Sequence, residues 1–189
     1  VTTNVLDVQD LTITKLWAGD NGNVYHTRPA AQNASLDWEV SFVIQRLEGN
    51  TWVNAQVYGD ANPLGRDLVI SLSGRDEQDT ASVTISGLPA GTYRARELQP
   101  GWQRAEDGSI PAEYILTEDG DYYRGAYDAA YADTPEGTTV TNTLDARTDL
   151  AAVKTWVPAP PEGAQVSLGV QYRNQGNRWG ELRRVMLDG

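Results

Sequence analysis

The chain has 189 residues, with 15 basic and 26 acidic side chains and a formal net charge of −11. This acidic balance disfavours nucleic acids and anionic membranes as partners. Cysteine is absent and His26 is the only histidine, so disulfides, thiolate metal sites, histidine triads and multi-histidine metal sites are excluded.

The predicted elements are short strands with almost no helix. Alternating runs separated by Gly, Pro, Asn and Asp clusters predict strands over 11–17, 38–47, 51–58, 67–73, 80–86, 91–98, 112–117 and 137–144. The segment 119–136 breaks the pattern, and we expect a long loop with one short helical turn there. Short, evenly spaced strands of this kind predict an all-β fold built as a β-sandwich.

The chain repeats itself at the scale of a domain. Leu11–Trp17 is echoed by Leu150–Trp156, and the lysines of the two runs, Lys15 and Lys154, are 139 residues apart. Further echoes link Val40–Arg46 with Val166–Tyr172, Trp52 with Trp179, and Thr3–Asp7 with Thr141–Asp145. We therefore expect a piece of a tandem array: the tail of a preceding repeat or a linker at 1–9, a complete domain at 10–146, and the incomplete first part of a second at 147–189.

Lysine is used sparingly, which draws attention to the two that are present. Lys15 and Lys154 are the only lysines, against thirteen arginines, and each stands two positions before a tryptophan. Arginine supplies surface charge as well as lysine does, but its guanidinium stays protonated and is no amine nucleophile. The pattern favours a chemical role for both lysines.

Strand alternation directs three polar side chains into the predicted core. Successive residues of a strand face opposite sides of a sheet. Lys15 shares a face with Leu11, Ile13 and Trp17, and Asn142 lies between two apolar neighbours on its face. In the run 93–97, Glu97 points inward, whereas the two arginines of that run are expected to face solvent.

Two interpretations fit a buried lysine, glutamate and asparagine. One is a buried Lys15–Glu97 salt bridge to which Asn142 adds a hydrogen bond. The other is an autocatalytic amide cross-link, in which burial leaves a neutral amine beside a neutral acid. In that case Lys15 attacks the Asn142 carboxamide, and Glu97 polarises its carbonyl and moves protons as ammonia leaves.

Several motifs resemble the Cna protein B-type domain of Gram-positive surface adhesins and pilins. The resemblance covers roughly 10–146 and rests on the motifs Lys15-Leu16-Trp17, Arg28-Pro29, Gly87–Tyr93, Arg96-Glu97, Pro100-Gly101-Trp102 and Thr141-Asn142-Thr143, while Lys154-Thr155-Trp156 opens a second copy. It implies a sandwich of reversed immunoglobulin-like topology with an isopeptide bond between the first and last strands. By position, Lys15 is then the nucleophile, Glu97 the catalytic acid and Asn142 the electrophile. Lys154 is a second-repeat nucleophile with no partner in this chain.

The resemblance implies a non-enzymatic, structural protein on the extracellular, cell-wall-attached surface of a Gram-positive bacterium. We expect a stalk segment whose partners are neighbouring repeats of the same polypeptide, with no cofactor, no nucleic acid and no membrane contact. One alternative is an adhesive module that binds a host glycoprotein or glycan through loops 18–37 and 119–136. Another is a pilin shaft subunit, which is disfavoured because both lysines are expected in buried strands.

The remaining candidate sites are acidic turns. The clusters Asp76–Asp79 and Glu118–Asp121 carry oxygen ligands of the kind that calcium prefers, but neither follows the EF-hand spacing. A solvated turn is the expectation for both, and no metal site is predicted.

Overall fold

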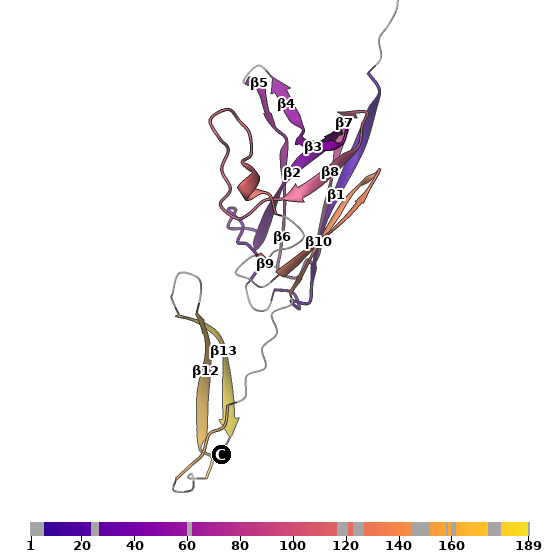
Figure 1. The fold of residues 1–189 in the computed structure, drawn as a ribbon. Helices are drawn as coiled ribbons and strands as arrows, with labels where there is room; N and C mark the ends of the chain where they lie inside the picture. The colour runs from indigo at the N-terminus through magenta and orange to yellow at the C-terminus, as the bar shows by residue number, and fades with distance from the viewer. Residues whose placement is uncertain are drawn as a thin grey trace, which may run out of the picture. The chain divides into compact units, whose positions relative to one another are not determined.

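The computed structural model describes residues 6–23, 27–59, 62–116, 121–122, 127–144, 152–157, 159, 162–173 and 179–188. The chain divides into two compact units, Val1–Ala146 and Arg147–Gly189 (Figure 1). The described residues form strands and a single 3₁₀ turn, η1 (Ala112–Tyr114), so the predicted all-β class is confirmed. The described part of the chain contains no helix long and apolar enough to cross a membrane.

One sheet of the first unit joins strands from the two ends of the unit. Its order is β7 (Thr80–Pro89), β1 (Val8–Ala18), β11 (Gly137–Leu144), β10 (Tyr127–Thr134) and β9 (Asp121–Tyr122). β1 pairs antiparallel with β7 and parallel with β11. The early strand β1 and the late strand β11 are thus hydrogen-bonded neighbours.

A second sheet is built around β2 (Trp38–Glu48). β2 pairs antiparallel with β8 (Tyr93–Glu97), with β6 (Val69–Gly74) through its first half and with β3 (Thr51–Asn54) through its second. The strands β4 (Gln56–Gly59) and β5 (Asn62–Asp67) form a separate hairpin (Figure 1).

The main core lies between these two sheets, as in a β-sandwich. It includes Leu11, Ile13 and Val140 from the first sheet and Phe42 and Ile44 from the second, all without solvent exposure. A smaller cluster of Val43, Leu98 and Ile110 lies on the other face of β2. The second sheet therefore buries both faces of its central strand, and alternation alone does not distinguish inside from outside there.

Two predicted segments differ from the structure. The expected strand at 112–117 is the turn η1 followed by a single bridge between Leu98 and Ile115, because Pro111 lacks an N–H and the next residues close 3₁₀-type bonds. The expected loop at 119–136 contains β10, which pairs with β11 over its whole length. Its sequence, Tyr127–Thr134, is rich in Ala and Asp, which are depleted in strands.

β10 also corrects the prediction that both arginines of β8 face solvent. Arg96 is only 9% exposed, because its guanidinium pairs with both oxygens of Asp133 at the end of β10. The same guanidinium lies over the Tyr131 ring, 4.5 Å from its centroid. The alternation of β8 is as predicted, but the covering strand was not foreseen.

The second unit contains an antiparallel hairpin of β12 (Gln165–Arg173) and β13 (Trp179–Asp188). In β2 and β3, Trp52 pairs with Leu47, and in the second hairpin Trp179 pairs with Arg173. Leu47 and Arg173 stand at equal spacing after Val40 and Val166 of the sequence echo. The two hairpins therefore share their strand order and register.

Gly137 permits the close approach of β11 to β1, and its replacement tests how tightly this pairing is packed. A Cβ atom at this position would overlap the carbonyl oxygen of Thr12. That oxygen belongs to the backbone of β1 and cannot move aside as a flexible side chain could. We expect Gly137→Ala to lower the stability by about 3 kcal/mol, in the range of overpacked cores. Thermal unfolding of Gly59→Ala is the control, since a Cβ at Gly59 meets no atom within 4 Å. Equal melting of the two variants would contradict the packing described.

Candidate functional site: a buried lysine, glutamate and asparagine

Lys15, Glu97 and Asn142 are all fully buried, each with 0% solvent exposure. Lys15 follows Leu11 and Ile13 on the inner face of β1, and Asn142 follows Val140 on the inner face of β11. Glu97 follows Tyr93 and Ala95 on β8 of the opposite sheet. The inward orientation predicted from strand alternation is confirmed for all three.

The three side chains meet through the glutamate carboxylate. Lys15 Nζ donates to Glu97 Oε2 at 3.2 Å, and Asn142 Nδ2 donates to Glu97 Oε1 at 3.3 Å. The backbone register pairs Lys15 with Val140 and Trp17 with Asn142. Lys15 and Asn142 therefore stand one inward-facing step apart on adjacent parallel strands, with Glu97 bridging them from across the core.

The carboxamide oxygen of Asn142, Oδ1, is the unfavourable feature of this arrangement. It is buried and has no hydrogen-bond partner among the described residues, which is costly for a carboxamide oxygen. Turning the amide over would present Oδ1 to the Glu97 carboxyl in place of Nδ2. A protonated Glu97 would then donate to that oxygen, which polarises the carbonyl and makes its carbon more electrophilic.

Burial favours the neutral form of both ionisable groups, Lys15 and Glu97. Desolvation lowers the pKa of Lys15 to about 8, against the opposing attraction of the Glu97 carboxylate. Desolvation likewise raises the pKa of Glu97 above its usual range, although Lys15 and Asn142 stabilise its charged form. Moving one proton from the ammonium to the carboxylate leaves an amine and an acid, the pair needed for acyl transfer.

An ionic cluster beside this site was missed by the sequence analysis. Arg28, 5% exposed, lies in the segment between β1 and β2 and forms a two-point pair with Asp20. Asp79, which directly precedes β7, pairs with the same guanidinium, and Asp76 accepts a hydrogen bond from Asn23. Residues of the predicted loop 18–37 and of the acidic turn 76–79 thus bind each other. The only available signal was the Arg28-Pro29 motif, which gives no contact partners.

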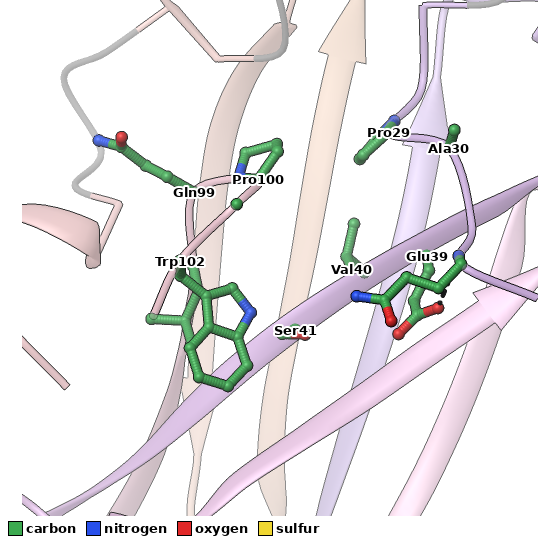
Figure 2. Close-up of a pocket in the computed structure, with 11 residues that line it drawn as sticks. Pro29, Ala30, Glu39, Val40, Ser41, Gln99, Pro100 and Trp102 are labelled. Carbon is green, nitrogen blue, oxygen red and sulfur yellow. Dashed lines mark hydrogen bonds between the residues drawn. The ribbon is translucent and has the colours of Figure 1, made fainter. Parts of the chain in front are cut away.

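A recess on the surface of the first unit has a volume of about 100 Å³. Figure 2 shows Pro100 and Trp102 on one side, Pro29 and Ala30 on the other, and Ser41 of β2 between them. Pockets for small-molecule ligands usually hold roughly 300–1,000 Å³. The recess is therefore too small to enclose such a ligand, and its lining contains no buried charge.

Lys154 differs from Lys15 in its environment. The described residues 152–157 form no strand, and Lys154 is exposed, which corrects the expectation that both lysines lie in buried strands. A strand needs a neighbour that pairs with its backbone, and none pairs with this segment among the described residues. Lys154 Nζ lies 4.4 Å from the Trp156 ring centroid, as Lys15 Nζ lies 4.2 Å from that of Trp17.

Parts of the predictions fall outside the described residues. They are His26, Asn4 with most of the N-terminal echo, and residues 118–120 of the second acidic cluster. Within the described part of the chain, no group of three or more potential metal ligands comes together.

Comparison with protein-family models, with curated proteins and with solved structures finds no match.

The contrast between the two lysines predicts their reactivity. In the folded chain, a water-soluble amine reagent should modify Lys154 and the N-terminal amine but leave Lys15 untouched, since Lys15 has no solvent exposure. Peptide mass mapping after brief labelling measures this, and Lys154→Arg is the control that should remove the internal signal. Labelling of Lys15 at the rate of Lys154 would contradict the burial described.

Proposed function

We propose that the first unit is a covalently locked structural domain, in which Lys15 and Asn142 are joined by an isopeptide bond that Glu97 catalyses. The observation that carries the proposal is the contact of one buried carboxyl with both the Lys15 amine and the Asn142 amide. The fold that the motifs imply, a reversed immunoglobulin-like sandwich of the Cna protein B type, belongs to the same proposal.

The reaction is an acyl transfer with ammonia as the leaving group. Glu97 first takes a proton from the Lys15 ammonium. The neutral amine that remains attacks Cγ of Asn142 through Nζ. Glu97 donates a hydrogen bond to Oδ1 as the carbonyl carbon becomes tetrahedral. It then gives its proton to the departing nitrogen and takes the second proton from Nζ, so that it ends as a neutral acid. The Nζ–Cγ bond forms, the Cγ–Nδ2 bond breaks, and one NH₃ leaves. Adjacent strands supply the proximity that a slow amide exchange requires.

A salt bridge alone is the competing account, and the energetics favour condensation over it. A buried ion pair gains little net stability, because the desolvation of two charges offsets their attraction. The Asn142 carbonyl oxygen also stays unpaired in the salt-bridged state. Condensation removes the ammonium, neutralises Glu97 and lets its carboxyl donate to the new amide, so no unpaired charge remains in the core.

The domain is proposed to serve as a stalk segment in a cell-surface adhesin of a Gram-positive bacterium. Support comes from the sequence echo between the two units and the shared register of their hairpins. The adhesive alternative gains no support from the described residues, because Arg28 and Tyr127 of the two proposed binding loops are buried in their own domain. The exposure of Lys154 removes one argument against the pilin shaft alternative, namely that both lysines lie in buried strands.

Loss of either bond partner should make the domain much less stable. The bond would close a loop of about 127 residues, which by the chain-entropy argument stabilises by roughly 4–5 kcal/mol. We therefore expect Lys15→Ala and Asn142→Ala to melt well below the native chain. Because alanine also leaves a cavity and an unpaired partner, the informative variant is Glu97→Gln, which keeps the shape but loses the acid.

The comparison is made by calorimetry and by protease resistance of the first unit. Glu97→Gln should refold to the same secondary structure as the native chain. It should melt at a lower temperature than the native chain, and the protease should cleave it faster. Arg75→Gln, whose side chain is exposed and which likewise replaces a charged group by an amide, serves as the control. If Glu97→Gln melts together with the native chain, the domain gains nothing from this site and the proposal fails.

A further inference from the structure

The ionic cluster beside Lys15 is built so that one arginine is completely fixed. Arg28 Nε and Nη2 donate to the two oxygens of Asp20 at 2.6 and 2.8 Å, and Nη2 also donates to Asp79 at 2.6 Å. Nη1 donates to the backbone oxygens of Asp76 and Gln78 at 3.2 and 3.1 Å. All five N–H donors of a guanidinium are thereby used. Such a side chain holds one position and one orientation.

Trp17 connects this fixed arginine with the amine of Lys15. The Arg28 Cζ atom lies over the Trp17 ring, 5.2 Å from its centroid, and Lys15 Nζ lies over the same ring at 4.2 Å. Tyr127 meets the ring edge-on at 5.1 Å, and its hydroxyl donates to Asp20 Oδ2 at 2.7 Å. The indole is therefore held by groups that are themselves bound to the arginine cluster.

We propose that Arg28 is a positioning residue for the amide-forming reaction: through Trp17 it orients the Lys15 amine toward Asn142, and its fixed positive charge favours the neutral form of that amine. This inference rests on the proposed function. Arg28 touches neither reacting atom, so its influence passes through the indole and through the electric field.

The charges that face Lys15 come from two segments of the chain, and their signs differ. Glu97 of β8 lies closest, Arg28 and Asp20 lie on the segment between β1 and β2, and Asn142 of β11 is neutral. After burial and Glu97, the next contribution to the Lys15 pKa is Arg28, which lowers it, followed by Asp20, which raises it. Removing the Arg28 charge should therefore make Lys15 more basic, and removing the Asp20 charge should make it less basic.

The rate of bond formation should depend on pH in a bell-shaped manner. The reactive form holds one proton on the Lys15–Glu97 pair, as a neutral amine beside a neutral acid. The rate falls at low pH as the pair gains a second proton, and it falls above about pH 8 as the pair loses its last one. If Lys15 becomes more basic, the alkaline limb of the pH–rate profile moves to higher pH. The fraction of molecules in the reactive form also falls, which lowers the maximum rate.

The experiment starts from the full chain unfolded in guanidinium, recovered from inclusion bodies before it has folded. Folding is started by dilution into buffers of different pH, and intact mass follows the loss of ammonia with time. For Arg28→Gln we expect a maximum rate about three- to tenfold lower and an alkaline limb shifted upward by on the order of half to one pH unit. For Asp20→Asn we expect the alkaline limb to shift downward.

Arg96→Gln is the matched control, because it also breaks a two-point arginine–carboxylate pair, with Asp133. The Arg96→Gln substitution should leave the alkaline limb of the pH–rate profile at the same pH, even if folding is slower. Circular dichroism reports whether each variant folds, and if Arg28→Gln does not, Asp20→Asn decides. An unchanged pH profile in the folded variants, or an equal shift in Arg96→Gln, would overturn the inference. Failure of the native chain to lose ammonia at any pH would instead overturn the proposed function.

Discussion

The burial of the Lys15 ammonium and the Glu97 carboxylate is the constraint on which the rest of the structure depends. Both groups have no solvent exposure and lie in a core otherwise formed by side chains such as Ile13, Phe42 and Val140. Charges in such a place must pair, shift their pKa values or react. The two sheets bring together the groups that pairing, a pKa shift or a reaction requires. One sheet carries Lys15 and Asn142, and the other carries Glu97.

The position of the proposed bond also suits a chain that bears tension. β1 and β11 are parallel, so pulling on the two ends of the unit loads their hydrogen bonds in shear. A bond from Lys15 to Asn142 lies near the end of both strands, and force would pass through it rather than through the roughly 127 residues between. Unlike a disulfide, an amide cannot be reduced. The proposed bond would thus give a domain without cysteine a permanent cross-link in its core.

Strand alternation was enough to predict the inward faces of β1, β8 and β11, and hence the three buried polar residues. Period-2 patterns carry this information locally, within five or six residues. Contacts between distant segments carry no such local signal. The strand β10 was missed because its Ala and Asp residues disfavour strands in isolation and only pairing with β11 stabilises them. Arg28 was missed as a partner of Asp20 and Asp79 for the same reason, since a predicted loop gives no direction to its side chains.

The cross-link is tested most directly by the mass of the purified native chain and of its peptides. The account predicts an intact mass lower than that of the sequence by one ammonia, about 17 Da, and a proteolytic fragment in which the segments containing Lys15 and Asn142 are joined. Glu97→Gln should show neither. An intact mass equal to that of the sequence, with the Lys15 and Asn142 peptides recovered separately, would contradict the account.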